Sequence, residues 1–559
     1  MRKLKLVDVK GSQNFTKTPN FSKTPNLEIL VLESTRIVNV HPTIGFLQRL
    51  KVLNLRNCRN LKTLPTKIGT ESLETLILSG CSNVERIPEN IGEMEGLVEL
   101  YLDGTGIKQL PSSIGNLRNL VLLNLKDCGN LVSLPNSING CKCLKTLNLS
   151  GCSKVENLPE NLQLVEALEE LDLSETSIRT PPSFIFHMKN LKVLSLQGCN
   201  GPPSKIQHQW PFLSKVNQRV SPNSKALSLP TSLSGLRSLK ELNLSDCNLG
   251  DGTIPSDIGC LSTMETLILC NNNFTSLPAT FNQLSKLTVL KLADCKRLKS
   301  LPELPTSVSK LWLDGCSSLE VIESSSTAYN STIQQYFCGF NCFKLAENNN
   351  VVEMLKRHLK VTANARIEHD IFIPGNEIPR WFSHQRIDSS NSIKILLPPN
   401  LLENSQFMGF AFCCVFLTDL KDNPRRMDPI SYFICPDCNN MVENISCRTI
   451  IDVKNSREID NLYYHLAGKS SRVTEDHLWL HYWPRDKLKQ VEISSSTEEG
   501  LEIEVLFKIF GVHSRVKKCG VRLVFTKDFE EIDQTIDERE MDQTSSNFDD
   551  IHIETLLFD

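Results

Sequence analysis

The sequence lacks both a charge excess and long apolar runs, and each absence excludes a class of protein. Its 559 residues carry a formal net charge of −3, whereas nucleic-acid-binding domains usually show a basic face. No run approaches the ~18 apolar residues that a membrane-spanning helix needs, and Met1–Asp8 includes no apolar stretch of signal-peptide length. We therefore expect a soluble protein of a reducing, intracellular compartment, with no nucleic-acid partner and no membrane span.

One leucine-rich pattern fills the first two-thirds of the chain. It reads Leu-x-x-Leu-x-Leu-x-x-(Cys/Thr/Asn) and then Leu-x-x-Leu-Pro, as at Leu50–Cys58, Leu73–Cys81 and Leu144–Cys152. About thirteen copies, with a period of roughly 20–29 residues, predict an α/β leucine-rich-repeat solenoid. Because side chains alternate across a strand, the leucines of each x-Leu-x-Leu-x segment should point inward. The stacked strands should then form a parallel β-sheet on the concave side of a curved horseshoe. The copies open at Leu4, Leu27, Leu50, Leu73, Leu97, Leu120, Leu144, Leu168, Leu191, Leu239, Met264, Leu287 and Val308.

Twenty cysteines would suggest a disulfide scaffold if they were not placed on the repeats. Eight share one slot, at the turn after the strand, and are spaced along the solenoid rather than paired: Cys58, Cys81, Cys128, Cys152, Cys199, Cys247, Cys295 and Cys316. We expect these to be buried structural thiols rather than nucleophiles. Cys435 and Cys438 form an isolated Cys-x-x-Cys pair, near which only Cys447 and His465 could complete a zinc site, without a recognised spacing. Neither a zinc site nor a redox motif is therefore favoured.

The repeat array departs from its period at two places. Residues 201–228, in the repeat that opens at Leu191, form an insertion that carries Trp210, Phe212 and several basic residues but no repeat pattern. Such insertions are often plain loops, although loops on solenoids also bind partners. The first repeat begins almost at Met1, without the polar capping unit that a solenoid end normally needs. We therefore expect the chain to be part of a longer protein with further domains upstream.

The composition changes near Glu323, where the repeat pattern ends. Aromatic and β-branched residues then recur in short alternating runs that are typical of a β-sandwich. One amphipathic helix is expected at Val351–Leu359. The predicted organisation is a repeat domain at 1–325, a linker at 326–335, a β-domain at 336–527 and an acidic, disordered tail at 528–559. The alternating runs are Ile393–Leu396, Phe410–Phe416, Leu478–Tyr482, Leu501–Phe507 and Val521–Phe525.

His477 and His481 have the i, i+4 spacing of a metal-binding pair on a helix. However, histidine and tryptophan alternate with leucine and tyrosine from His477 to Trp483, which is typical of a strand. On a strand the two histidines lie too far apart to share one ion easily. We expect no metal here.

The segment Phe372–Phe382, which reads Phe-Ile-Pro-Gly-Asn-Glu-Ile-Pro-Arg-Trp-Phe, resembles a known domain signature. It is similar to that of the C-terminal jelly-roll/Ig-like domain (C-JID) that follows the repeats in plant TIR-NB-LRR (TNL) disease-resistance proteins. Three further stretches agree: Phe340–Leu345, Asp476–Tyr482 and Val516–Phe525. The repeats also carry the phrase Leu-Pro-x-x-Ile-Gly, as at Leu110–Gly115. The resemblance implies an all-β jelly-roll/Ig-like sandwich after the solenoid. It assigns a mostly structural role to the signature residues Phe372, Pro374, Gly375, Ile378, Pro379, Trp381 and Phe382.

The resemblance also implies a function. In TNL receptors the repeats and the jelly-roll domain bind a pathogen effector, a nucleotide-binding module oligomerises, and the assembled TIR domains cleave NAD. The partner expected for this chain is therefore a pathogen effector or a guarded host protein. In the full receptor, a nucleotide-binding module in cis and a homo-oligomer would be added. The compartment would be the cytoplasm, with the nucleus as a second location.

The phosphate-binding loop of that nucleotide-binding module, Gly-x-x-x-x-Gly-Lys-(Ser/Thr), is missing from this sequence. The nearest match, Gly468–Ser470, has Tyr463 where the loop needs a glycine. We therefore expect this chain to bind partners rather than to catalyse a reaction, and to need no cofactor.

Partner specificity is expected from the residues that vary between the leucines on the concave sheet. Such residues would supply the polar rim and aromatic anchors of an interface, although exposed repeat positions are also often simply solvated. Trp312 stands out, because an outward-pointing tryptophan on a strand rarely lacks a partner or a covering segment, and the β-domain itself is one candidate cover. The candidates are Glu99, Tyr101, Asp103, Lys126, Asp127, Glu170, Asp172, Glu175, Lys291, Asp294, Trp312 and Asp314, with Trp210 and Phe212 in the insertion.

A second class of function stays open, that of a leucine-rich-repeat substrate adaptor for ubiquitin ligation or another protein-interaction scaffold. Cysteine-containing repeats also occur in F-box proteins. Those repeats lack the Leu-Pro-x-x-Ile-Gly phrase, and no F-box precedes this array. The receptor interpretation is therefore preferred.

Overall fold

The computed structural model describes residues 3–65, 72–199, 226–323, 335–347, 350–387, 391–418, 446–453, 456–461, 475–489, 501–510 and 514–529. The chain divides into two compact units. The repeat unit comprises Met1–Lys291, Ser300–Val308 and Ile322–Ser324. The C-terminal unit comprises Leu292–Lys299, Ser309–Val321 and Ser325–Asp559.

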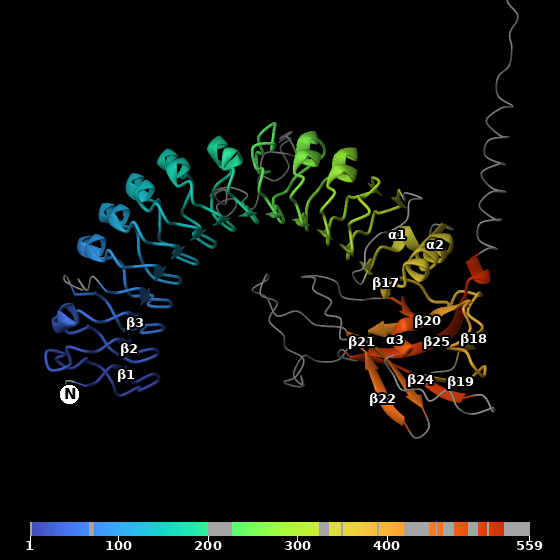
Figure 1. Cartoon of the computed structure of the whole chain (residues 1–559). Helices are drawn as coiled ribbons and strands as arrows, with labels where there is room; N and C mark the ends of the chain where they lie inside the picture. Colours follow the sequence, from blue (N-terminus) through green and yellow to red (C-terminus); the bar gives the residue numbers. More distant parts are fainter. Residues whose placement is uncertain are drawn as a thin grey trace, which may run out of the picture. The chain divides into compact units, whose positions relative to one another are not determined.

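Short parallel strands run through the repeat unit, one in each repeat (Figure 1). Each pairs in register with the next, so that the inward leucine of one repeat lies beside that of its neighbour, as Leu53 pairs with Leu76 and Leu76 with Leu100. These leucines are fully buried and form the core of the unit. The predicted solenoid with its parallel sheet on the concave side is thereby confirmed. The strands are β1 (Leu6–Asp8), β2 (Ile29–Val31), β3 (Val52–Asn54), β4 (Thr75–Ile77), β5 (Glu99–Tyr101), β6 (Leu122–Asn124), β7 (Thr146–Asn148), β8 (Glu170–Asp172), β9 (Val193–Ser195), β10 (Glu241–Asn243), β11 (Thr266–Ile268) and β12 (Val289–Lys291).

Short 3₁₀ helices lie on the side of the repeats opposite the strands (Figure 1). Pro111, in extended conformation, precedes one of them, and Ile114 at its third position is fully buried. The next residue, Gly115, faces the backbone carbonyl of Ser137 so closely that a Cβ atom would collide with it. The Leu-Pro-x-x-Ile-Gly phrase is thus explained by a proline that ends the extended segment, an anchor in the core and a close approach of two backbones. The 3₁₀ helices are η1 (Pro42–Phe46), η2 (Glu89–Glu93), η3 (Ser112–Asn116), η4 (Asn136–Gly140), η5 (Glu160–Leu164), η6 (Ser183–His187), η7 (Ser256–Cys260) and η8 (Ala279–Gln283).

The cysteines of the repeat slot form a ladder of hydrogen bonds. Cys81 Sγ donates to the carbonyl of Leu55 in the preceding repeat at 3.0 Å, and Cys152 Sγ donates to the carbonyl of Leu125 at 3.1 Å. Burial raises the pKa of the Cys81 thiol to about 12. All eight cysteines of the slot are fully buried. The prediction of buried structural thiols is therefore confirmed.

The C-terminal unit contains a β-sandwich. Within this unit one sheet runs in the order β14-β16-β17-β23-β20-β25-β18, with parallel pairing from β14 to β17 and antiparallel pairing beyond. The other sheet has the order β19-β24-β21-β22. The strands of the two sheets are β14 (Lys310–Trp312), β16 (Gln335–Cys338), β17 (His369–Pro374), β18 (His384–Arg386), β19 (Ser392–Leu397), β20 (Phe407–Thr418), β21 (Ser446–Val453), β22 (Ser456–Asn461), β23 (His477–Pro484), β24 (Leu501–Phe510) and β25 (Ser514–Phe525).

Side chains of both sheets meet in one core, where Phe412 and Trp479 of the first sheet join Ile395, Val505 and Phe507 of the second. The alternating runs of the sequence all fall in strands of this sandwich, and the predicted amphipathic helix is part of α2 (Asn350–Ala365). The remaining elements are β13 (Ser300–Leu301), β15 (Val321–Ile322), α1 (Phe343–Glu347), α2 (Asn350–Ala365) and α3 (Arg485–Lys489).

The repeat geometry continues past the last repeat that the sequence pattern predicts. Asn341 has φ 60°, like Gly315 with φ 75° at the same point of the preceding repeat. Cys342 Sγ donates to the carbonyl of Leu313 at 3.1 Å, as the ladder cysteines do. Phe337 replaces the first leucine, since it pairs with Leu311. β16 is therefore the strand of a further repeat, and β17 pairs beside it as the next parallel strand.

Candidate binding surface

Nine of the predicted surface residues lie in the repeat unit. Five are on strands, where they alternate with the buried leucines, and all five are partly or fully exposed: Glu99, Tyr101, Glu170, Asp172 and Lys291. Asp103 and Lys126 follow the second leucine of their repeats and are half-buried. Asp127 and Glu175 are exposed one residue further on. All nine thus lie on or directly beside the strands that form the concave sheet.

The position of Asp127 and Glu175 has a backbone requirement that the sequence pattern alone did not show. Both residues have left-handed backbone angles, with φ 57° and 58°. Glycine takes this position in several other repeats, for example Gly80 and Gly151. Aspartate tolerates the left-handed region because its short side chain can bond locally, but glutamate has no such advantage. Backbone conformation therefore accounts for Asp127 but not for Glu175.

Four carboxylates form what we call the acidic zone, over β5–β8: Glu99, Asp103, Glu170 and Asp172. Each accepts a hydrogen bond from a neutral hydroxyl, for example from Ser79 to Asp103 at 2.7 Å and from Thr146 to Glu170 at 3.1 Å. Within the described part of the repeat unit, none of the four forms an ion pair with a basic side chain. Lys126 takes the position of Asp103 in the next repeat, so the acidic zone contains one lysine but is negative overall.

The residues directly before the strands behave differently. Glu74 pairs with Lys51 at 2.9 Å, and Glu169 pairs with Lys145 at 3.3 Å and with Lys192 at 2.6 Å. These pairs cross from one repeat to the next. Negative charge at this row is therefore neutralised within the array, whereas the acidic zone on the strands is not.

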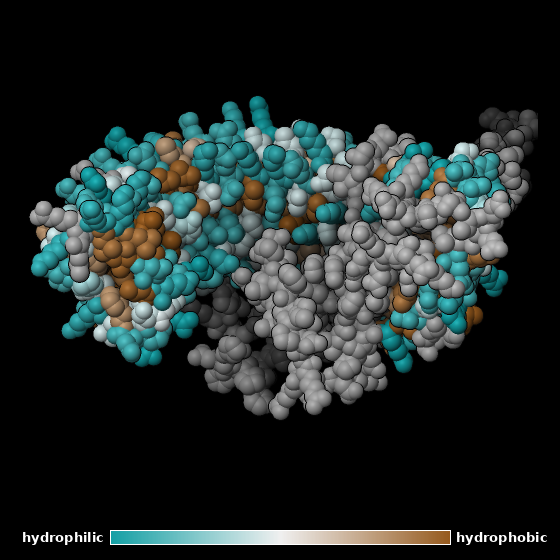
Figure 2. Space-filling model, turned by 60° about the horizontal axis from the view of Figure 1, so that its bottom comes forward, coloured by the Kyte–Doolittle hydropathy of each residue, from teal (hydrophilic) through white to brown (hydrophobic). Residues whose placement is uncertain are grey.

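An apolar zone lies beside the acidic zone, over β1–β4. Five of the eight outward strand positions there are apolar, namely Leu6, Ile29, Val31, Val52 and Ile77, and the other three are Asp8, Asn54 and Thr75. The register pairs Leu6 with Ile29 and Ile29 with Val52 in one column. Figure 2 shows hydrophobic surface over the N-terminal part of the repeat unit. None of these residues was among the predicted surface positions, although apolar residues at outward strand positions are a signal that could have found them.

Tyr101 lies where the two zones meet. Its strand neighbour in the register is Ile77 of the apolar zone, and its hydroxyl donates to Glu99 of the acidic zone at 3.5 Å. Burial and the charge of Glu99 raise the pKa of Tyr101. The ring and the hydroxyl thus connect two chemically different halves of one sheet face.

Three predicted surface residues belong to the C-terminal unit, and one of them is not on the surface. Asp314 is only 3% exposed, so the expectation of an outward, exposed position is wrong for this residue. Its Oδ1 accepts hydrogen bonds from Cys338 Sγ at 2.8 Å and from the Phe340 amide at 3.2 Å. Burial raises the pKa of Asp314 to about 7, although both hydrogen bonds act in the opposite direction. The further repeat on β16 covers this carboxyl group.

Trp312 has a covering segment of the kind that the sequence analysis considered. Its ring lies 5.3 Å from the ring of Tyr336 on β16, and it packs against the sandwich core. For Trp312, internal packing therefore accounts for a tryptophan at this strand position. The third of these residues, Asp294, is half-buried in a left-handed turn with φ 60°.

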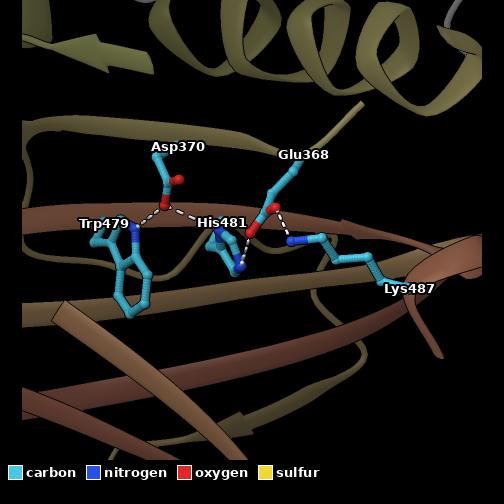
Figure 3. A network of polar contacts seen from close by, with 5 residues as sticks. All are labelled: Glu368, Asp370, Trp479, His481 and Lys487. Atoms are coloured by element: carbon cyan, nitrogen blue, oxygen red, sulfur yellow. Dashed lines mark hydrogen bonds and ion pairs between the residues drawn. The ribbon is translucent and has the colours of Figure 1, made fainter. Parts of the chain in front are cut away.

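A buried polar network connects two strands of the sandwich (Figure 3). Asp370 Oδ1 on β17 accepts from Trp479 Nε1 at 2.7 Å and contacts His481 Nδ1 at 2.9 Å, both on β23. His481 Nε2 lies 3.7 Å from Glu368 Oε1, and Lys487 of α3 pairs with the other oxygen of Glu368. Burial alone would lower the pKa of His481, but the charges of Asp370 and Glu368 outweigh it and raise that pKa. Since His481 and Asp370 are 3% and 0% exposed, this pair has no access to a substrate.

His477 lies on the same strand in a different environment. Its Nε2 accepts the amide N–H of Asn341 at 3.0 Å, and its Nδ1 bonds the carbonyl of Glu475 at 2.9 Å. Burial lowers the pKa of His477 to about 4. Among the described residues, no group of three His, Cys, Asp or Glu side chains is placed to hold a metal ion. In the same part of the chain, no helix has the length and apolar character that crossing a membrane requires.

Comparison with known families and proteins agrees with both halves of this geometry. Residues 373–530 match the C-JID domain, residues 69–158 match the family of disease resistance protein RPS4B-like leucine-rich repeats, and residues 238–261 match the Leucine Rich Repeat family. The expected resemblance is confirmed. This chain carries the leucine-rich repeats and the C-JID domain of plant TNL disease-resistance proteins.

Several curated relatives are disease-resistance proteins. Disease resistance-like protein DSC1 of Arabidopsis thaliana is 33% identical over 42% of this chain, and disease resistance protein RPS4B of the same plant is 28% identical over 42%. TMV resistance protein N of Nicotiana glutinosa is 35% identical over 24% of this chain and 12% of its own length. The matched region covers 20% of the length of DSC1 and of RPS4B.

Solved structures with leucine-rich repeats are also similar. The plant peptide hormone receptor RGFR1 in complex with RGF2 is 19% identical, covers 58% of this chain and 64% of its own, and has a TM-score of 0.32. The functional domain of InlJ from Listeria monocytogenes, which includes a cysteine ladder, is 13% identical, covers 70% of this chain and 73% of its own, and has a TM-score of 0.35. At these scores the fold assignment rests on the strands and ladders described above.

The C-JID signature residues are mainly interior in this chain. Phe372 and Phe382 are 0% and 2% exposed, and Pro374, Ile378 and Pro379 are also buried, while Gly375 is half-buried. Trp381 is half-exposed, with its ring 4.3 Å from that of Phe382 and 6.0 Å from the guanidinium of Arg522. Four other predicted positions, Trp210, Phe212, Cys435 and Cys438, lie outside the described residues.

Proposed function

We propose that this chain is the sensor region of an intracellular plant immune receptor. It recognises a pathogen effector, or a guarded host protein, by protein–protein binding through the surfaces of its repeats and of its C-JID domain. The observation that carries the proposal is the concave sheet of the repeat unit, where the four carboxylates of the acidic zone form no ion pair with the described residues of that unit. A solenoid positions such residues on a rigid scaffold, and charged or aromatic residues left there favour a protein partner.

The chain acts by binding in this proposal. Its repeats and C-JID domain supply interaction surfaces, and the predicted domain boundaries at 325, 336 and 527 define them. In the whole receptor, binding would release a nucleotide-binding module in cis and lead to a homo-oligomer. The place of action would be the cytoplasm, with the nucleus as a second location.

The test is direct binding between the purified chain and individual effector proteins of plant pathogens. We expect at least one effector to co-elute with residues 1–559 in size-exclusion chromatography. A variant in which Glu99, Asp103, Glu170 and Asp172 are all changed to lysine should lose that binding. A second variant, Glu95→Lys with Glu156→Lys, reverses two exposed carboxylates away from the strands and should keep it.

The opposite pattern would contradict the assignment of the surface. If an effector bound the four-site variant and the wild type equally, the repeats of this chain would not be its recognition surface.

A further inference from the structure

The apolar zone is an unusual surface for a sheet that faces water. Along each strand the leucines already point into the core, so the outward side chains should be polar if nothing covers them. Yet Leu6 is 52% exposed, and Ile29, Val31, Val52 and Ile77 are half-buried on the same face. Leu6, Ile29 and Val52 follow one another in one column of the register, and Val31 lies beside this column on β2. Ile77 lies in the other column, where Asn54 separates it from Val31. Contiguous exposed apolar surface commonly marks an interaction site.

The neighbouring charge identifies the occupant. From Ile77 the register continues to Tyr101 and then to Asn124, along the row that reaches Asp172 on β8. The four carboxylates of the acidic zone accept hydrogen bonds from neutral groups and lack ion pairs with the described residues. An acidic partner or a polyanion would be repelled there, whereas lysine and arginine side chains would be attracted.

We propose that the concave face of the repeat unit binds a basic, amphipathic segment of a partner protein. Apolar side chains of that segment contact the apolar zone, and its lysine and arginine side chains pair with the acidic zone. Tyr101, at the border, contacts the junction between the two halves of the segment. The inference rests on the proposed function and names the chemistry of the partner that the same surface recognises.

The closest test uses synthetic peptides and the full chain. One peptide has leucine and phenylalanine in its first half and lysine and arginine in its second half. Its counterpart keeps the apolar half and replaces each basic residue by glutamate. We expect the basic peptide to bind residues 1–559 at least about tenfold more tightly than the acidic one, measured by fluorescence anisotropy. The difference should shrink when salt rises above about 0.15 M, because screening weakens exposed charge pairs.

Variants of the chain then locate the binding. Glu99→Lys combined with Asp172→Lys should weaken the basic peptide by about tenfold and strengthen the acidic one. Val31→Ser combined with Ile77→Ser should weaken both peptides, since both share the apolar half. Glu95→Lys combined with Glu156→Lys, which changes the net charge by the same amount, should leave both affinities unchanged. A thermal unfolding curve for each variant shows that it is folded.

The outcomes separate this inference from the proposed function. Equal affinity for the two peptides in the wild type would overturn the inference without any variant. The inference would also be overturned if the Glu95→Lys, Glu156→Lys control lost the preference for the basic peptide, as the Glu99→Lys, Asp172→Lys variant should. The preference would then follow the net charge of the chain and not the acidic zone. Self-association of the chain through this face, abolished by Val31→Ser with Ile77→Ser, would assign the face to a second copy and would also overturn it. An effector that binds although the peptide preference is missing would leave the proposed function standing.

Discussion

The pH dependence of the C-terminal unit should reveal the environment of His477. Both ring nitrogens are used in the neutral form, since Nε2 accepts from the Asn341 amide and Nδ1 bonds the Glu475 carbonyl. Burial lowers the pKa of this histidine from 6.5 to about 4. The unfolded chain therefore takes up a proton at a higher pH than the folded chain does. Stability that is present above pH 6.5 is lost as the pH falls from 6.5 towards 4.

The size of the effect follows from the two pKa values. A difference of about 2.5 pKa units corresponds to about 3 kcal/mol when the pH is well below 4. Between pH 7.5 and pH 5.0 the loss amounts to about 2 kcal/mol of the free energy of unfolding. His481 has the opposite sign, because its raised pKa adds stability below pH 6.5 that is lost as the pH rises through the folded value. A comparison with a matched variant is therefore needed.

His477→Gln provides that comparison, because a glutamine amide can also accept one hydrogen bond and donate another but does not titrate. Unfolding in urea can be followed by tryptophan fluorescence, which reports on the C-terminal unit through Trp479 and Trp483. We expect the wild type to lose about 2 kcal/mol more than the variant between pH 7.5 and pH 5.0. If the two proteins showed parallel pH profiles, the neutral, buried histidine described here would be refuted.

Three further predictions concern the repeat unit. In the native protein a thiol reagent such as DTNB should label the exposed Cys143 rapidly and Cys81 only after unfolding, because burial raises the Cys81 pKa to about 12; equal labelling rates would contradict the buried ladder. Gly115→Ala should lower the free energy of unfolding by about 1–3 kcal/mol, because the new Cβ meets the Ser137 carbonyl; the same change at Gly129, which has open space around it, is the control. Glu175→Asn should raise the free energy of unfolding by about 0.5–1 kcal/mol, since asparagine tolerates φ 58° better; an unchanged melting curve would argue against strain there.

The repeats could be predicted from the sequence because each of their parts has a local cause. The leucine period fixes which side chains point inward, and a small residue with left-handed backbone angles, such as Gly80 with φ 74°, allows the turn after each strand. Cys81 then follows in the buried slot, within reach of the Leu55 carbonyl. The sandwich strands could be predicted for a similar reason, since alternation over a few residues decides which face is buried.

Contacts between distant segments could not be predicted in this way. Asp370 meets Trp479 and His481 across more than 100 residues of sequence, and no local pattern announces such a pair. Asp314 was expected to face solvent because it was taken as one of the variable positions on the concave sheet. The further repeat on β16 lacks that pattern, with Phe337 and Gly339 in place of leucines, but it keeps the turn at Asn341 and the ladder thiol of Cys342. This segment therefore keeps the backbone geometry of a repeat although it has lost the leucine pattern.

The apolar zone was missed for a different physical reason. Periodicity separates inward from outward positions only when the outward residues are polar, and on β1–β4 many of them are not. Ile29-Leu30-Val31-Leu32 reads as one continuous apolar run, so the alternation that identifies a solvated face is hidden. Only the register and the exposure of Ile29 and Val31 show that two of these four side chains face away from the core. Loss of alternation within an otherwise regular repeat is therefore itself informative, because it indicates where the outer face of a strand is suited to contact a partner rather than water.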